Sequence, residues 1–261
     1  MPYATHDGVR IHYEIEGDGL PGIAPVVCYH GFTGSLDEMY DFGYVEALSA
    51  DRRLILIDAR GHGASDAPHA PEAHHVESLA GDVLAVMDAE GLARPHFFGY
   101  SMGGRVGFGL ARVAPERLLS LVIGGITPFA ADPAKIDRRV ATWRKGLAAI
   151  EPAMARGYGA AWTPAMRERF LANDLEAMVA FLAGLKTFDC EDVLPAMIMP
   201  CLLYAGENDT VFYDDMRCCA SRVPGARWIS LPDLSHLEVY VRSDLIVPHL
   251  RAFWGEVEGS L

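Results

Sequence analysis

Gly99-Tyr100-Ser101-Met102-Gly103 is the stretch that decides the fold, because it joins an apolar run to a helical pattern. The run His96 to Tyr100 has the composition of a buried strand, and Met102 to Val113 places apolar residues at helical spacing. A serine in a sharp strand-to-helix turn needs neighbours without Cβ atoms two positions away, which the two glycines supply. The helix N-terminus there favours developing negative charge. We therefore predict that Ser101 is a nucleophile, rather than a serine in a helix-packing turn.

Similar short apolar runs recur along the chain, as is typical of strands buried on both faces of a parallel sheet. Helical patterns separate several of them, notably Val76 to Glu90. Strand alternating with helix predicts an α/β fold with a mostly parallel, doubly wound sheet. Val9 to Ile15 alternates apolar and polar residues after Gly8, which predicts an antiparallel hairpin at the sheet edge. The other predicted strands are Pro25 to Tyr29, Leu54 to Ile57, His96 to Tyr100, Leu119 to Ile123, Cys201 to Ala205 and Arg227 to Leu231.

The segment 127–192 interrupts this alternation. Its helical patterns are rich in Met, Trp, Phe and Ala, and it has no convincing strand pattern. A bare connection of this length between consecutive strands would be long, although a run of ordinary crossover helices is the alternative. We therefore predict a core domain formed by residues 1–126 and 193–261, with residues 127–192 inserted as a helical cap.

A nucleophilic serine needs a base, and the base needs an orienting acid. Asp209 follows the predicted strand 201–205, and His236 follows the last predicted strand. The chain order Ser, Asp, His is the order expected in a fold whose nucleophilic serine lies in such a strand-to-helix turn. His236 is also placed on the carboxyl side of a late strand, where the sites of open α/β sheets converge. We predict Ser101 as nucleophile, His236 as base and Asp209 as orienting acid.

Other titratable residues are expected to be solvated. A Pro/Ala-rich loop contains three histidines, His69, His74 and His75. No carboxylate near them has metal-ligand spacing, so we predict that they are solvated and form no metal site. The carboxylates that compete with Asp209 are expected as solvated loop acids: Glu207, Asp214 and Asp215. No organic cofactor is predicted either, since the chain supplies nucleophile, base and electrostatic stabiliser.

His30-Gly31-Phe32 ends an earlier strand near the nucleophile and suits an oxyanion hole. We predict that the backbone N–H groups of Phe32 and Met102 converge on the developing oxyanion, each contributing about 3 kcal/mol. For His30 we expect a structural role, with the ring holding the loop by hydrogen bonds.

Composition limits the class of partner. A formal net charge of -13 repels phosphate backbones and anionic lipid surfaces, and no basic stripe offsets it. We therefore expect a small-molecule substrate, with neither nucleic acid nor membrane as partner. Residues 1–16 resemble neither a secretory signal nor a membrane span, and the five cysteines lack CxxC spacing. Reduced thiols and a cytoplasmic location are the default expectation, and a homodimer stays open.

Five motifs in order resemble the α/β-hydrolase superfamily: His30-Gly31-Phe32, Asp58 to Ser65, Gly99 to Gly104, Gly206 to Asp209 and His236. The resemblance covers nearly the whole chain except the cap, and it implies an eight-stranded, mostly parallel sheet flanked by helices. It also implies a structural role for the loop from Asp58 to Ser65. One position departs from the family, since Ser235 stands where Gly often precedes the catalytic histidine.

These features predict a serine hydrolase that cleaves a small carboxylic ester or lactone through an acyl-enzyme on Ser101. Apolar cap residues would bind a largely apolar substrate, although they could equally form the cap's own core. The candidates are Met154, Tyr158, Trp162, Phe170, Met178 and Phe181.

Other chemistries use the same triad. The segments His30 to Ser35 and Gly99 to Arg105 also resemble menaquinone-pathway synthases, which eliminate pyruvate from a multiply charged acid. Arginines directed into the pocket would favour that lyase. The cap offers Arg138, Arg139, Arg144 and Arg156, which we expect to lie on solvated helix faces instead. A carbon-carbon bond hydrolase and a cofactor-free perhydrolase are further alternatives. A non-catalytic ligand-binding protein is expected to lack a triad member, and none is missing.

Overall fold

The apolar runs lie side by side in one sheet in the computed structural model, which describes residues 2–260. The eight strands follow the order β1-β2-β4-β3-β5-β6-β7-β8. The pairs β1·β2 and β2·β4 are antiparallel, whereas all the other neighbours are parallel. The strands are β1 (Tyr3–His6), β2 (Val9–Glu16), β3 (Val26–Tyr29), β4 (Leu54–Ile57), β5 (His96–Tyr100), β6 (Ser120–Gly124), β7 (Cys201–Gly206) and β8 (Arg227–Leu231).

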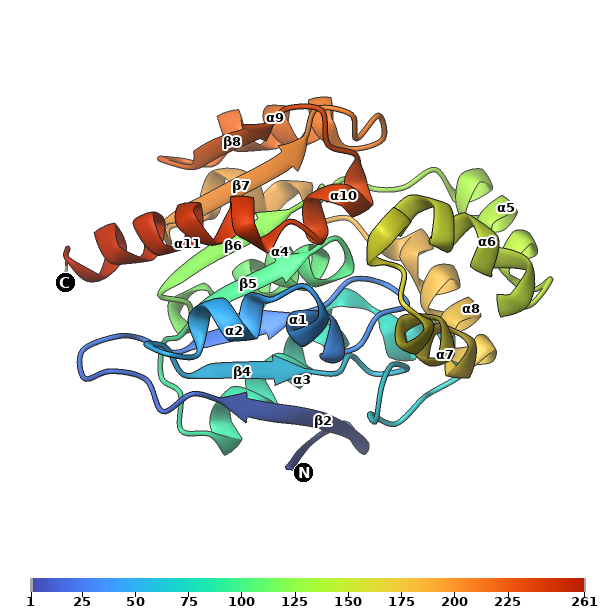
Figure 1. Ribbon diagram of the computed structural model, residues 1–261, viewed down its shortest axis with the longest axis horizontal. Coiled ribbons are helices and arrows are strands. Elements are labelled where there is room, and N and C mark those ends of the chain that lie inside the picture. Colours follow the sequence, from blue (N-terminus) through green and yellow to red (C-terminus); the bar gives the residue numbers. More distant parts are fainter. Residues whose placement is uncertain (1, 261) are drawn as a thin grey trace.

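Helices cover both faces of the sheet, which is why its central strands are apolar on both sides (Figure 1). One face packs against α3 (Val76–Ala89), α4 (Met102–Val113) and α9 (Tyr213–Arg222). The other face packs against α1 (Asp37–Asp41), α2 (Tyr44–Leu48) and α11 (Ser243–Glu258). The short helix α10 (His236–Tyr240) follows β8, and single turns of 3-10 helix lie at η1 (Pro71–His74) and η2 (Pro115–Arg117).

Between β6 and β7 the chain forms helices and no strand. They are α5 (Pro133–Trp143), α6 (Leu147–Tyr158), η3 (Gly159–Ala161), α7 (Pro164–Ala172), α8 (Leu175–Gly184), η4 (Leu185–Thr187) and η5 (Glu191–Ala196). Local signals start three of them, because Asp132, Thr163 and Asp174 each accept a hydrogen bond from a first-turn amide. Figure 1 shows α5 to α8 gathered beyond the arrowheads of the strands. We propose to describe residues 127–192 as a cap on the core formed by residues 1–126 and 193–261.

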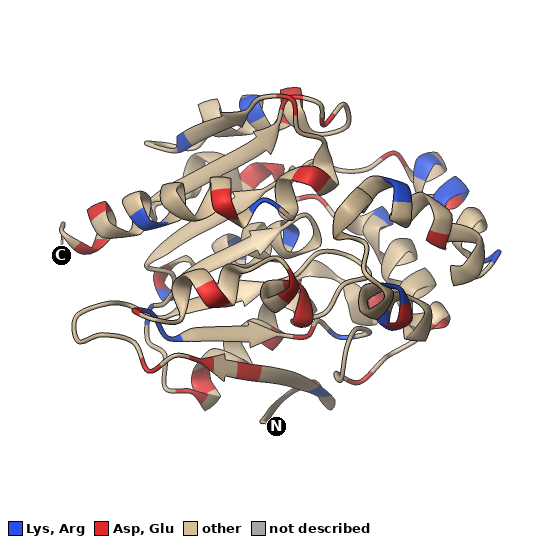
Figure 2. Cartoon of the chain, viewed as in Figure 1, with Lys and Arg blue, Asp and Glu red and all other residues tan. Residues whose placement is uncertain are grey.

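Charge is distributed unevenly between these two parts. Residues 127–192 contain equal numbers of acidic and basic side chains, so the formal net charge of -13 belongs to the rest of the chain. Figure 2 shows this contrast, with blue positions concentrated on the cap helices and red positions spread over the sheet and its helices. In the described residues, no helix is both long enough and apolar enough to cross a membrane.

The expected α/β fold is confirmed, and three strands begin and end at the predicted residues. One expectation about the loop after β4 is wrong, because His74 is buried rather than solvated. Its Nε2 atom lies 2.8 Å from the Pro68 carbonyl oxygen, and α8 covers the ring with Phe181 and Gly184. Packing between distant segments buried this residue, and local composition could not predict that.

The other residues expected in solvent are not deeply buried. His69 is exposed and lies 2.9 Å from an Asp174 carboxylate oxygen, and His75 is half-buried. Glu207 is exposed and accepts a hydrogen bond from Ser230. Asp214 and Asp215 are exposed too, although they belong to the first turn of α9 rather than to a loop.

Candidate active site

Ser101 occupies a strained turn between β5 and α4. Its backbone adopts φ 52° and ψ -109°, a conformation that residues other than glycine rarely adopt. The flanking glycines are needed for close packing: a Cβ atom on Gly99 would lie 2.4 Å from the Gly103 carbonyl carbon. A Cβ atom on Gly103 would lie 2.3 Å from the Tyr29 carbonyl oxygen. The turn can therefore place the serine beyond the end of the strand only because residues 99 and 103 are both glycine.

Three side chains from separate loops form one hydrogen-bonded chain. His236 Nε2 lies 3.1 Å from Ser101 Oγ, and His236 Nδ1 lies 2.7 Å from Asp209 Oδ2. With the Nδ1 proton donated to the carboxylate, Nε2 is left to accept the serine proton. The Asp209 side chain is 2% exposed and that of His236 is 26% exposed, so the acid is shielded while the base stays accessible. The structure thus brings the predicted nucleophile, base and acid together.

Backbone amides hold the Asp209 carboxylate in place. Its Oδ1 atom accepts hydrogen bonds from the amides of Val211 and Phe212, both at 3.2 Å. The end of β7, just before Asp209, packs tightly against the loop that precedes His236, since a Cβ atom on Gly206 would lie 2.0 Å from the Leu234 carbonyl oxygen. Acid and base are therefore positioned by loops that pack directly against each other.

Ser235, which departs from the family pattern, has a definite place. It precedes α10, and its amide donates a 2.8 Å hydrogen bond to the Glu238 carboxylate in the first turn of that helix. This contact fixes the helix that begins with His236. The serine is thus compatible with the histidine position that the sequence predicts.

The loop after β3 carries the first predicted oxyanion donor. Because β3 and β5 are parallel neighbours with Tyr29 opposite Gly99, Phe32 and Met102 both follow this pair by three residues. Neither amide donates a hydrogen bond to an acceptor in residues 2–260. His30 lies beneath: its Nδ1 is 2.7 Å from the Gly31 carbonyl oxygen, and its Nε2 accepts from the Ala59 amide at 3.0 Å. Burial lowers the pKa of His30, which keeps the ring neutral and able to accept that bond.

The side chain of Phe32 joins the cap to the loop 30–36 between β3 and α1, which we name the oxyanion loop after its predicted role. Its ring stacks on Phe181 and packs against Trp143, with centroid distances of 5.0 Å in both cases. The Arg139 guanidinium carbon lies 5.4 Å from the centroid of the same ring. Cap position and oxyanion-loop position are therefore coupled by direct contact.

Arg105 is a site feature that sequence reasoning missed. It lies one helical turn after Ser101, and its amide donates to the Ser101 carbonyl oxygen. Its Nη1 atom is buried without a hydrogen-bond partner among the described residues, and its guanidinium carbon lies 4.6 Å from the Phe188 ring centroid. Burial, and secondarily the charge of Arg139, lower the pKa of Arg105 to about 10. The available signal was an arginine one turn beyond the nucleophile.

All four cap arginines, Arg138, Arg139, Arg144 and Arg156, are exposed, and the guanidinium group of Arg139 also contacts the Phe32 ring. Within the described part of the chain, no carboxylate forms an ion pair with Arg105 or Arg139. Arg139, beside Phe32, and Arg105, beside Phe188, are therefore two guanidinium groups without a carboxylate partner among the described residues.

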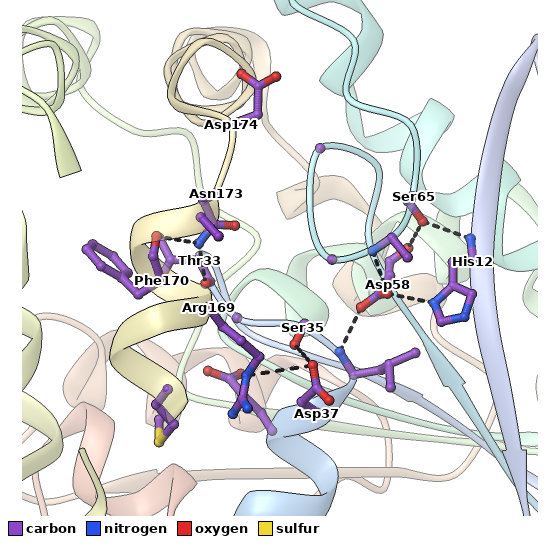
Figure 3. Close-up of a pocket in the computed structure, with 18 of the residues that line it drawn as sticks. His12, Thr33, Ser35, Asp37, Asp58, Ser65, Arg169, Phe170, Asn173 and Asp174 are labelled. Carbon is purple, nitrogen blue, oxygen red and sulfur yellow. Dashed lines mark hydrogen bonds and ion pairs between the residues drawn. The ribbon is translucent and has the colours of Figure 1, made fainter. Parts of the chain in front are cut away.

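A cavity of about 440 Å³ lies between the cap and the core loops (Figure 3). On the cap side Arg169 faces Asp37 of α1, and Asn173 donates a 3.0 Å hydrogen bond to the Thr33 carbonyl oxygen. Tyr158, Trp162 and Phe170, three of the six predicted substrate-contacting residues, line it. Ser101 does not, so this cavity adjoins the oxyanion loop rather than enclosing the nucleophile.

The other three predicted cap residues lie elsewhere. Phe181 lines a smaller cavity of about 140 Å³ together with Arg105. Met178 is completely buried in the core, and the half-buried Met154 packs against both hydrophobic clusters. The aromatic contacts from Phe32 through Trp143, Phe170 and Trp162 to Tyr158 show that much of this set also forms the interior of the cap.

No three histidine, cysteine, aspartate or glutamate side chains in residues 2–260 form a group that could hold a metal ion.

Comparison with known proteins agrees with this geometry. Residues 24–177 match the family model described as alpha/beta hydrolase fold. The enol-lactonase from Burkholderia xenovorans LB400 superposes with a TM-score of 0.86 at 29% identity, covering 97% of this chain and 99% of that chain.

Two curated relatives match to different extents. A protein described as a carbamate hydrolase from Stutzerimonas stutzeri (strain A1501) is 28% identical over 96% of this chain and all of that protein. A protein described as 2-succinyl-6-hydroxy-2,4-cyclohexadiene-1-carboxylate synthase from Bacillus subtilis (strain 168) is 37% identical, over 47% of this chain. That second match spans only 43% of the synthase.

Proposed function

We propose, from the premise that this chain belongs to the α/β hydrolase fold family, that it is a serine hydrolase of small carboxylic esters or lactones. The observation that carries the proposal is the hydrogen-bonded chain from Ser101 through His236 to Asp209. A serine hydroxyl becomes a useful nucleophile only when such a base accepts its proton as it attacks. The strained backbone of Ser101 and the free amides of Phe32 and Met102 add support.

The reaction proceeds in two halves. His236 Nε2 accepts the proton as Ser101 Oγ attacks the carbonyl carbon, and the Phe32 and Met102 amides stabilise the oxyanion. The tetrahedral intermediate collapses, the C–O bond to the leaving group breaks, and the protonated His236 gives its proton to the departing oxygen. Water then attacks the acyl-enzyme by the same route and releases the acid. Asp209 keeps the imidazole in the required tautomer throughout.

Relatives support ester-type chemistry, since one solved structure is an enol-lactonase and one full-length relative is described as a carbamate hydrolase. Both names denote attack on a carbonyl group bonded to oxygen. The aromatic cap residues Tyr158, Trp162 and Phe170 support a substrate of modest size with an apolar portion.

A substrate panel tests the proposal directly. Short-chain esters, lactones and charged diketo acids are assayed with the wild type and with Ser101→Ala. We expect turnover of at least one ester or lactone, loss of that turnover by several orders of magnitude in Ser101→Ala, and no covalent labelling of the variant by an organophosphonate. Equal turnover by both proteins would rule out the acyl-enzyme mechanism.

A second candidate is a lyase that eliminates pyruvate from a charged substrate, and one observation favours it. Arg105, whose Nη1 atom is buried without a hydrogen-bond partner, and Arg139, which is exposed beside Phe32, have no carboxylate partners among the described residues, and a substrate carboxylate could pair with them. In this reaction His236 and Ser101 would remove a proton from the substrate instead of forming an ester. Release of pyruvate with a new carbon-carbon double bond in the co-product, and with no hydrolysis of any ester, would select the lyase. Pyruvate released from a diketo acid together with a carboxylic acid would instead indicate hydrolysis of a carbon-carbon bond.

A further inference from the structure

Glu38 is a buried acid outside the triad. It belongs to α1, directly after the oxyanion loop, and only 5% of the residue is exposed. Tyr158 of cap helix α6 donates a 3.1 Å hydrogen bond to its Oε1 atom. The Oε2 atom is buried without a hydrogen-bond partner in residues 2–260. One oxygen of this carboxyl group is therefore hydrogen-bonded to the cap, and the other has no hydrogen-bond partner among the described residues.

The carboxyl group lies directly against the oxyanion loop. A Cβ atom on Gly34 would stand 2.1 Å from Glu38 Oε2, so the loop can approach only because residue 34 is glycine. The Gly31 amide, immediately before Phe32, is close enough to influence the pKa of Glu38. The group thus fills the inside of the turn that carries the Phe32 amide.

A tyrosine connects the same place to the nucleophile turn. The Tyr240 ring stacks on Tyr100 with centroids 4.6 Å apart and an interplanar angle of 7°. Tyr100 precedes Ser101, and its hydroxyl donates to the His236 carbonyl oxygen. The Tyr240 hydroxyl is close enough to the Glu38 carboxyl group to influence its pKa, although it forms no hydrogen bond within residues 2–260. One buried cluster therefore adjoins the oxyanion loop, the nucleophile turn and the cap.

We propose that the protonated Glu38 carboxyl group is a positioning residue, which holds the loop carrying the Phe32 amide between cap helix α6 and Tyr240. The inference rests on the proposed function, because it assigns a role to the oxyanion loop of that mechanism. A neutral carboxyl fits the buried site. An ionised one would need compensation by water or a cation, whereas the structure provides a single hydrogen bond, from Tyr158, and leaves Oε2 without a partner among the described residues.

Charges around the group agree with this role. Burial, with a smaller effect of Asp41, raises the pKa of Glu38 to about 8, although Tyr240, Tyr158 and the Gly31 amide act to lower it. Arg169 of α7, the cation on this side, already pairs with Asp41 and Asp37. Burial raises the pKa values of Tyr158 and Tyr240 well above their ordinary range, so both keep their protons where Glu38 titrates.

Ionisation of Glu38 should therefore loosen the oxyanion loop and reduce kcat more than it changes KM, because the Phe32 amide acts mainly in the transition state. For a group that titrates near 8, kcat should fall about tenfold from pH 7 to pH 9. Glu38→Gln keeps the shape and removes the titration, so its kcat should fall less than about twofold over that interval. Glu46→Gln, which changes an exposed glutamate on α2, is the matched control and should keep the tenfold fall.

The experiment measures kcat and KM between pH 6 and pH 10 for wild type, Glu38→Gln, Glu46→Gln and Tyr158→Phe, with Ser101→Ala as blank. Tyr158→Phe removes a contact that lowers the pKa of Glu38, so its alkaline limb should move to higher pH. An alkaline limb unchanged in Glu38→Gln would overturn the inference, as would a folded Glu38→Gln protein inactive at every pH. Full turnover by Ser101→Ala would instead overturn the proposed function.

Discussion

Gly103 lies so close to Tyr29 that a Cβ atom on residue 103 would stand 2.3 Å from the Tyr29 carbonyl oxygen. That oxygen belongs to the end of β3, just before the oxyanion loop, so the contact joins the nucleophile turn to the loop that faces it. Backbone cannot give way as a flexible side chain can. We therefore expect Gly103→Ala to displace the turn and to reduce kcat/KM by at least about 100-fold, as misplacement of reacting groups by about 1 Å does.

Gly255 in α11 provides the matched control. A Cβ atom there meets nothing within 4 Å, and alanine is a better helix former than glycine by about 1 kcal/mol. Gly255→Ala should keep wild-type kcat/KM and raise the melting temperature slightly, whereas Gly103→Ala should lower it. Equal activity of the two variants would show that the close approach does not position Ser101.

A buried ion pair fixes the N-terminal hairpin. Arg60 and Asp82 are almost completely buried, and the Asp82 carboxylate also lies 3.1 Å from His6 Nδ1 of β1. Asp82→Asn would leave the guanidinium charge buried without compensation, so we expect it to lower the free energy of unfolding by about 3 kcal/mol or more. Asp88→Asn, which breaks an exposed pair with Arg117, should cost less than about 1 kcal/mol. Urea titration of both variants measures the difference, and similar losses would contradict the assignment.

Glu38 should also give stability a distinct pH dependence. The folded state raises the pKa of Glu38 from 4.5 to about 8, so between these values the folded protein holds a proton that the unfolded chain lacks. Stability from this group is full below pH 4.5 and is lost as pH rises towards 8, by about 1.4 kcal/mol per pH unit. Glu38→Gln removes this linkage. The free energy of unfolding of the variant, relative to that of the wild type, should therefore rise as pH increases across this interval. Parallel curves for the two proteins would disprove the raised pKa.

Much of the fold could be predicted from the sequence because its signals are local. The apolar runs of β4, β5 and β8 begin and end where strand patterns do, and the glycines around Ser101 define the turn between strand and helix. The Ser101, Asp209 and His236 positions follow from chain order at the ends of strands, which one sheet topology brings to the same edge.

Features that depend on contacts between distant segments could not be predicted. His74 is buried because α8 packs over η1, and Glu38 is buried because Tyr158 and Tyr240 arrive from α6 and α10. The same holds for the cap, where helical spacing identified aromatic residues but not the cavity each one lines. Arg105 was visible in the motif, yet only its unpaired position beside Phe188 distinguishes it from a solvated helix arginine.

Arg105 should determine how the enzyme distinguishes anionic from neutral substrates. Its pKa of about 10 keeps it charged at neutral pH, and no carboxylate in the described residues neutralises it. A hydrogen bond to a charged group contributes about 1.5 to 3 kcal/mol, so Arg105→Met should lower kcat/KM for a carboxylate-bearing ester or lactone by about ten- to one-hundred-fold. A neutral ester of the same size should lose less than about threefold, and Arg138→Met, at an exposed position of α5, should affect neither substrate. The comparison is the ratio of kcat/KM for the two substrates, and an unchanged ratio in Arg105→Met would mean that the substrate's charge is not recognised by this arginine.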